Sequence, residues 1–222
     1  MLKRPGCLGR CRGLAMVEFQ IVALLGCLPL LLGALQMFLL LMANHIVQYA
    51  TIEAARSGAV NGADPSAMTR ALAIGLLPLH AGADEGIQQG DLVPLATAAY
   101  ARSLAQTQLF GRIEILGPTA ADFADFSSED TAGRAIRNDA LQFRPVAAGP
   151  RSGRSIQEAN LLRIRVHYCH PLDVPFVRQL LIGMLRSVET DARVLACYAA
   201  GRVPLVAEAA VNMQSDARFH AD

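Results

Sequence analysis

A run of twenty-two residues, Ile21–Met42, contains only one strongly polar side chain, Gln36. As an α-helix that rises 1.5 Å per residue, this run would be about 33 Å long, which matches the hydrocarbon core of a bilayer. Buried helices of soluble proteins are usually shorter. The run therefore predicts a membrane-spanning helix, with the span at about residues 19–43.

Charge around this run is uneven and predicts its orientation. The first thirteen residues carry four basic side chains, Lys3, Arg4, Arg10 and Arg12, and no acidic one. Basic residues that flank a span stay on the cytoplasmic side, so residues 62–222 are expected in the compartment on the opposite side of the membrane. The whole chain has a formal charge of only +1, which gives no reason to expect nucleic acid as a partner.

Two kinds of cleaved signal fit the N-terminus poorly. A secretory signal has a shorter apolar run that ends in a small-x-small site, whereas Leu41 stands where a small residue is needed. The stretch before Cys27 resembles a lipoprotein signal. However, Glu18 would then lie inside the apolar core of that signal, and the chain stays apolar after the cysteine. An uncleaved anchor remains an alternative, with the carboxylate reaching the membrane interface.

The stretch RGLAMVEF explains more of the pattern. Gly13 is followed by four apolar residues and then by Glu18 and Phe19. This arrangement resembles the prepilin-peptidase site of type IV pilin-like proteins. The resemblance implies cleavage between Gly13 and Leu14, which makes the glutamate the fifth residue of the mature chain. Residues 1–13 would then be a basic cytoplasmic leader.

A carboxylate near hydrocarbon is costly and usually has a partner. In pilin-like assemblies the glutamate pairs with the N-terminal amine of a neighbouring subunit, which implies that Glu18 pairs with the amine released on Leu14. At 4 Å and an effective dielectric constant near 20, such a pair attracts by about 4 kcal/mol before desolvation costs. Glu18 and Phe19 are therefore the expected assembly residues, with membrane lipid around them.

Helical spacing continues beyond the span. Val47, Ala50, Ala54 and Gly58 recur on one face, so the helix is expected to cover residues 14–61. Pro29 is expected to loosen it, because proline cannot donate a backbone hydrogen bond.

Two stretches on this helix, MVEFQIVALLG and IEAARSGAVNG, resemble the TadE-like minor pilins of the Tad (tight adherence) pilus. The resemblance covers roughly residues 10–62 and, more weakly, the C-terminal VPLVAEAAVNMQSDA. It implies a minor pilin (pseudopilin) that takes part in pilus assembly for adhesion. It also implies a single-pass protein of a bacterial inner membrane, with the N-terminus in the cytoplasm and residues 62–222 in the periplasm. The implied partners are a prepilin peptidase, other pilin-like subunits and Tad assembly-platform proteins.

Residues 62–222 predict a small α+β domain with an antiparallel sheet. The expected helices are Ser66–Leu77, capped near Asp64 and ended by Pro78, then Leu92–Phe110 and Pro175–Arg186. Alternating apolar residues predict strands at 112–115, 162–168, 192–198 and 205–213. Residues 127–160 are rich in Gly, Ser, Arg and Asp and are expected to form a long loop in which Arg151 and Arg154 are solvated.

Cys169 and Cys197 both lie on the polar faces of predicted strands and in an oxidising compartment, so a disulfide between them is expected. The alternative is a metal site at His167, Cys169 and His170. It is disfavoured because His170 points to the opposite face of its strand from the other two. His45 and His80 are expected at an interface or the surface.

No cofactor motif or catalytic pattern is present in the sequence, so we expect no cofactor and no enzymatic activity. The chain is expected to be a structural subunit. An uncleaved, membrane-anchored periplasmic binding or sensor module is the alternative, as is a lipoprotein attached at Cys27.

Overall fold

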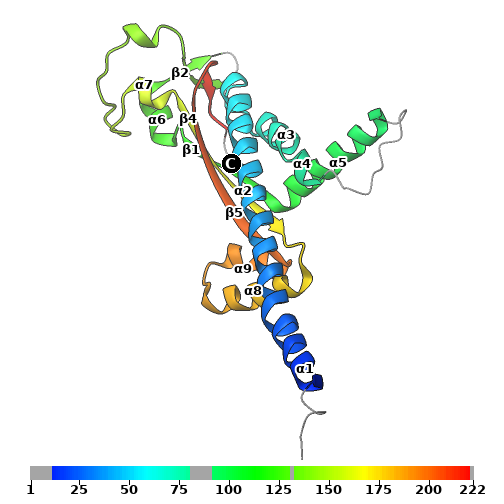
Figure 1. The fold of residues 1–222 in the computed structure, drawn as a ribbon. Coiled ribbons are helices and arrows are strands. Elements are labelled where there is room, and N and C mark those ends of the chain that lie inside the picture. Colours follow the sequence, from blue (N-terminus) through cyan, green and yellow to red (C-terminus); the bar gives the residue numbers. More distant parts are fainter. Residues whose placement is uncertain (1–11, 81–91, 131–132, 221–222) are drawn as a thin grey trace, which may run out of the picture.

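The computed structural model describes residues 12–80, 92–130 and 133–220, and shows one long helix joined to an α+β domain (Figure 1). The fold class is the one that the sequence predicts, because helices and antiparallel sheets follow an apolar N-terminal helix. In Figure 1 the long helix runs from dark blue to cyan. The domain packs along its upper part and leaves the dark blue end free.

The long helix, which we call the stem, has three consecutive segments: α1 (Arg12–Val22), the π-helical η1 (Ala23–Cys27) and α2 (Leu28–Val60). Residues Met16–Val60 form a 45-residue helix that is long and apolar enough to span a membrane. Only 6% of its most apolar window is buried, whereas the core helix of a soluble protein would be mostly buried. The stem ends near Asn61, as predicted, because Gly62 and Ala63 have positive φ values of 67° and 63°.

The stem is loosened where Pro29 was expected to loosen it. Proline has no backbone N–H, so the carbonyl of Leu25 cannot receive the usual bond from four residues further on. The π-helical segment η1 lies directly before this point. At its end, the N–H of Leu28 reaches back five residues to the carbonyl of Ala23. The π turn therefore relieves the proline without breaking the helix.

Three helices follow the stem: α3 (Pro65–Gly75), α4 (Leu77–His80) and α5 (Leu92–Phe110). The side chain of Asp64 caps α3 as expected, accepting hydrogen bonds from the N–H groups of Ser66 and Ala67. Hydrogen bonds to Ser66 hold the pKa of this carboxyl below its usual value. Pro78 does not simply end one helix, because it lies in the first turn of α4. The bounds of α5 agree with the sequence prediction.

The main sheet has three antiparallel strands in the order β1 (Gly111–Gly117), β4 (Leu161–Pro171) and β5 (Arg202–Asn212). On β4 the predicted alternation holds, because Leu162, Ile164, Val166 and Tyr168 are fully buried. This face packs against the predicted apolar side of α2, where Val47, Ala50, Ala54 and Gly58 are buried. The stem is therefore the central helix of the domain core as well as the apolar helix that emerges from it.

The expectation of a long loop at 127–160 is wrong in part. A second sheet with the order β2-β3-β6 is formed by β2 (Ser127–Asp130), β3 (Gly133–Ile136) and β6 (Ala217–Arg218). Three short helices also lie in or next to this stretch: α6 (Ala120–Phe126), which packs against β2 and β3, the 3-10 helix η2 (Leu141–Phe143) and α7 (Ile156–Ala159). Arg154 is not fully solvated, because its guanidinium lies 3.4 Å from the buried carboxylate of Asp122.

Two helices close the end of the domain nearest α1: α8 (Pro175–Val188) and α9 (Ala192–Ala199), both orange in Figure 1. Helix α8 confirms the prediction for this stretch. The strand predicted at 192–198 is wrong, because the segment is helical and Asp191 caps it by accepting from the N–H of Arg193. Val194, Leu195 and Tyr198 follow helical spacing and pack into one small apolar cluster.

Candidate functional site

The predicted processing and assembly residues all lie on α1. Gly13 and Leu14 are in its first turn. Glu18 and Phe19 follow one turn later and are exposed. Residues four apart in a helix lie on the same side of it, so the position of Glu18 on α1 is on the side of the backbone of Leu14. The structure therefore brings the predicted carboxylate within one helical turn of the predicted cleavage point.

The apolar part of the stem is open to contacts from outside. Leu24, Leu25, Leu30 and Leu31 are each more than 60% exposed. A side chain added at Gly26 or Gly33 would meet nothing within 4 Å. Such open small residues allow another helix to approach closely.

A groove of about 760 Å³ runs between α2 and α3, beyond the apolar run. Its walls are mostly apolar and include Tyr49, Val60 and Ile74, which are all exposed. One rim carries an exposed ion pair, with 3.1 Å between Arg56 Nη1 and Glu53 Oε1. The groove continues the exposed stem surface into the domain, so both belong to one candidate contact surface.

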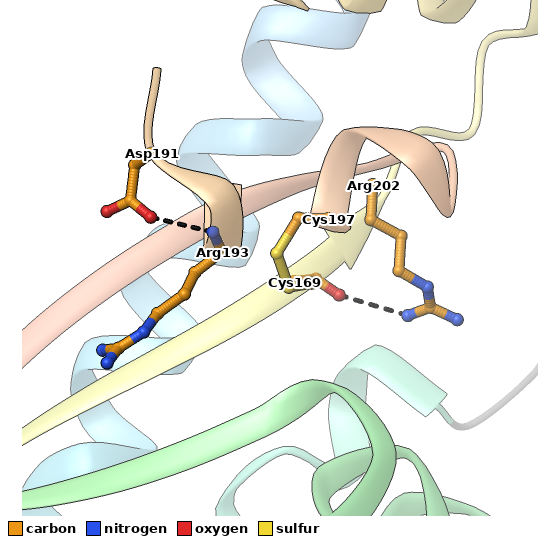
Figure 2. The surroundings of a disulfide bond; sticks show 5 residues. All are labelled: Cys169, Asp191, Arg193, Cys197 and Arg202. Atoms are coloured by element: carbon orange, nitrogen blue, oxygen red, sulfur yellow. Dashed lines mark hydrogen bonds between the residues drawn. A yellow bond between two sulfur atoms is a disulfide. The ribbon is translucent and has the colours of Figure 1, made fainter. Parts of the chain in front are cut away.

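Cys169 and Cys197 form a disulfide, as expected, with their Cα atoms 5.6 Å apart. Figure 2 shows that the bridge joins β4 to α9, so it joins a strand to a helix and not two strands. Among the described residues, Cys27 is a free, exposed cysteine.

Arg202 holds the same end of the sheet together. One guanidinium nitrogen donates to the carbonyl of Cys169 at 3.1 Å (Figure 2), and the other donates to Gln106 Oε1 at 2.9 Å. Its guanidinium carbon also lies 3.5 Å from the centre of the Phe110 ring. This arginine therefore links β5, β4 and α5 through two hydrogen bonds and a cation–π contact.

A buried polar group lies beside this arginine. The hydroxyl of Tyr168 is 3.0 Å from His80 Nε2, so His80 is partly buried against the sheet, whereas a position at an interface or the surface was expected. The His170 ring lies next to that of Tyr168, with 6.4 Å between their centres. Burial lowers the pKa of both histidines and raises the pKa of Tyr168.

The side chains of this group do not gather as metal ligands in the part of the chain that the structure describes. Tyr168 is fully buried and His170 nearly so. His167 lies on the other face of β4, with its Nε2 3.6 Å from Glu114 Oε2. Within residues 12–80, 92–130 and 133–220, no three His, Cys, Asp or Glu side chains group as a metal site would require. The arrangement is that of a polar cluster within the core.

Gln36 makes a buried contact with the domain that the sequence analysis did not predict. It is fully buried, and its Oε1 accepts a hydrogen bond from the backbone nitrogen of Val174 at 2.9 Å. As the single strongly polar side chain in the apolar run, it was itself a signal of a contact at that level.

Comparisons with protein-family models, curated proteins and solved structures found no match to this chain.

Proposed function

We propose that this chain is a minor pilin-like subunit, cleaved after Gly13 and assembled through its stem in a Tad-type pilus system. The observation that carries the proposal is the position of Glu18. It is an exposed carboxylate one helical turn after Leu14, on a stem whose apolar side chains are also exposed. An isolated anchor does not need a carboxylate there, whereas a packed array of helices gains register from it.

Other features support the same proposal. The basic residues before the stem favour a cytoplasmic leader, and the disulfide fits a domain in an oxidising compartment. Neighbouring stems would pack side by side in the membrane through the open positions at Gly26 and Gly33. Above the membrane, the groove between α2 and α3 would receive the continuing helix of a neighbour.

Mass spectrometry of the membrane-bound chain tests the processing step. Co-expressed with a prepilin peptidase, the chain should lose residues 1–13 and begin at Leu14. Gly13→Val should block this loss, whereas Gly9→Val is a matched control and should not. A chain that keeps its leader with active peptidase would contradict the proposal and favour the anchored binding or sensor module. Lipid on Cys27 would favour the lipoprotein.

The assembly step is tested separately with Glu18→Gln, which removes the charge and keeps the shape. Cleavage should continue, but the amount of chain recovered in sheared surface filaments should fall at least tenfold. Glu129→Gln, at an exposed position on β2 away from the stem and the groove, serves as the control and should leave recovery unchanged. Normal recovery of the Glu18 variant would remove the pairing role.

A further inference from the structure

The apolar face of α8 is wider than the domain can cover. Ile182 and Leu181 pack into the apolar cluster with α9. Leu180, Met184 and Val188 remain 61%, 60% and 83% exposed. These three residues are four apart, so they form a single stripe along the helix. We refer to them as the α8 stripe.

Helix α8 lies beside the stem at a level where the stem itself is apolar. Gln36 accepts a hydrogen bond from Val174, the residue before α8, and Leu40 packs against the cluster that contains Ile182. Both stem residues belong to the apolar run Ile21–Met42. Gln36 is six residues before the end of that run, or about 9 Å along the helix axis.

This depth and direction fit an interfacial helix. Amphipathic helices that lie in a membrane surface bury their apolar face about 5–10 Å into the boundary between headgroups and acyl chains. In Figure 1, α8 runs across the stem and not along it, as such a helix must when the stem crosses the bilayer.

Charge on α8 agrees with the same placement. The helix carries two exposed basic residues, Arg178 and Arg186, and no acidic residue. Each is two positions from a stripe residue, which puts it about 200° around the helix from that residue. Arginines on this side can reach the anionic headgroups while the stripe lies among acyl chains.

We propose that α8 lies in the membrane–water interface of the bilayer that the stem crosses, on the side that carries the domain. The α8 stripe is inserted among the acyl chains. The occupant of this apolar surface is therefore lipid. The hydrocarbon core then ends near Gln36, and the headgroup layer covers the next six residues to Met42. Twenty residues before Gln36, about 30 Å of helix, reach back to Met16. Glu18 then lies near the inner boundary. This inference rests on membrane anchoring by the stem and not on cleavage or pilus assembly.

Spin labels on the full-length chain in proteoliposomes test the inference. Cys7, Cys11 and Cys27 are replaced by serine, and the Cys169–Cys197 disulfide is kept. Single cysteines are then introduced by Leu180→Cys, Met184→Cys or Val188→Cys and labelled. Collision rates with oxygen, which concentrates in lipid, and with a neutral nickel chelate, which stays in water, are compared. The oxygen-to-nickel ratio should be at least fivefold higher at the stripe than at two matched controls.

The controls are Gln179→Cys, which is exposed on α8 away from the stripe, and Val206→Cys, which is an exposed apolar site on the sheet. A third label at Leu31, exposed within the apolar run, reports the anchor itself. Ratios at the stripe equal to those at the controls, with Leu31 still in lipid, would overturn the α8 inference alone. A water-exposed Leu31 would overturn both the inference and the anchor.

The proteoliposomes contain on average fewer than one chain per vesicle, which excludes contacts between copies of the chain. Spin labels at the stripe that collide with neither oxygen nor the nickel chelate at this dilution would show that protein covers the stripe. That result would also overturn the assignment of lipid as the occupant. Circular dichroism and a non-reducing mass for the intact disulfide confirm that each variant is folded.

Discussion

The side-chain oxygen of Gln36 accepts a hydrogen bond from the backbone nitrogen of Val174, which is 138 residues further along the chain. Both groups are buried, and the bond ties the start of α8 to the stem. The domain thereby satisfies the side-chain oxygen of a polar residue inside an apolar run, whereas Nε2 of the same side chain is buried without a hydrogen-bond partner among the described residues. The bond fixes the level at which α8 meets the stem.

Gln36→Leu should loosen the α8–α9 end of the domain. The substitution leaves the buried N–H of Val174 without a partner, which costs about 1–3 kcal/mol. Hydrogen exchange followed by mass spectrometry should show faster exchange across residues 172–200, with the main sheet unchanged. Gln48→Leu is the matched control, because Gln48 is exposed on the same helix. Equal exchange in the two variants would contradict this role for Gln36.

Gly75→Ala should destabilise the domain. A Cβ at Gly75 would lie 2.6 Å from both Cα and Cβ of Ala50, where α3 crosses the stem. Overpacking of this kind typically costs about 1–3 kcal/mol. Gly183→Ala should do the opposite, stabilising by about 0.5–1 kcal/mol, because that helical site is open. Chemical denaturation in detergent checks both, and the prediction fails if the two changes have the same sign.

Loss of the disulfide should destabilise the end of the domain that carries α9. Cys169 and Cys197 are 28 residues apart, and a loop of that size gives about 3.5 kcal/mol in the chain-entropy model. The double serine variant should therefore unfold at lower denaturant than the parent. Cys27→Ser is the control, because its thiol is free and exposed. A reductant should lower the stability of the parent but not that of the double variant.

Stability should fall as the pH drops below about 6.5. Burial lowers the pKa of His80 and His170 below their usual value of 6.5, with Arg202 adding to the shift and Asp173 opposing it at His170. The unfolded chain therefore takes up protons near pH 6.5 while the folded chain does not. The free energy of unfolding is highest above that pH and decreases below it.

Denaturation at pH 7.5 and 5.5 measures this decrease. Circular dichroism is the suitable signal, because the chain has no Trp. His80→Phe removes one partly buried titrating group and should make the decrease smaller. His45→Gln, at an exposed position on the stem, should leave it unchanged. A decrease of the same size in all three chains would assign it to other groups.

Elements with a strong local signal could be predicted from the sequence. In β4 and α5 the segment is long enough for the spacing of apolar residues to distinguish a strand from a helix. The segment 192–198 was assigned wrongly because its apolar residues fit both periods over only seven positions. The cap at Asp191 was the signal that favours the helix. Strands of four residues, such as β2 and β3, are too short to show a period at all.

Contacts between distant parts of the chain were less predictable. The disulfide was expected from compartment and cysteine count, although one partner is on a helix. The pairing of His80 with Tyr168 joins residues 88 positions apart, and no local pattern encodes it. The proposed roles of Gly13 and Glu18 could be suggested from the sequence because the motif that they resemble is defined by spacing along one helix.

The π turn at Ala23–Cys27 has a consequence for how the stem meets its neighbours. A π turn adds one residue to the helical repeat, so side chains beyond it are rotated by about 100° relative to an uninterrupted α-helix. The angular positions of Glu18 and Gln36 around the helix axis therefore cannot be related by counting 100° per residue. Heptad counting carried straight through residue 25 would assign the buried and exposed sides of one half of the stem incorrectly.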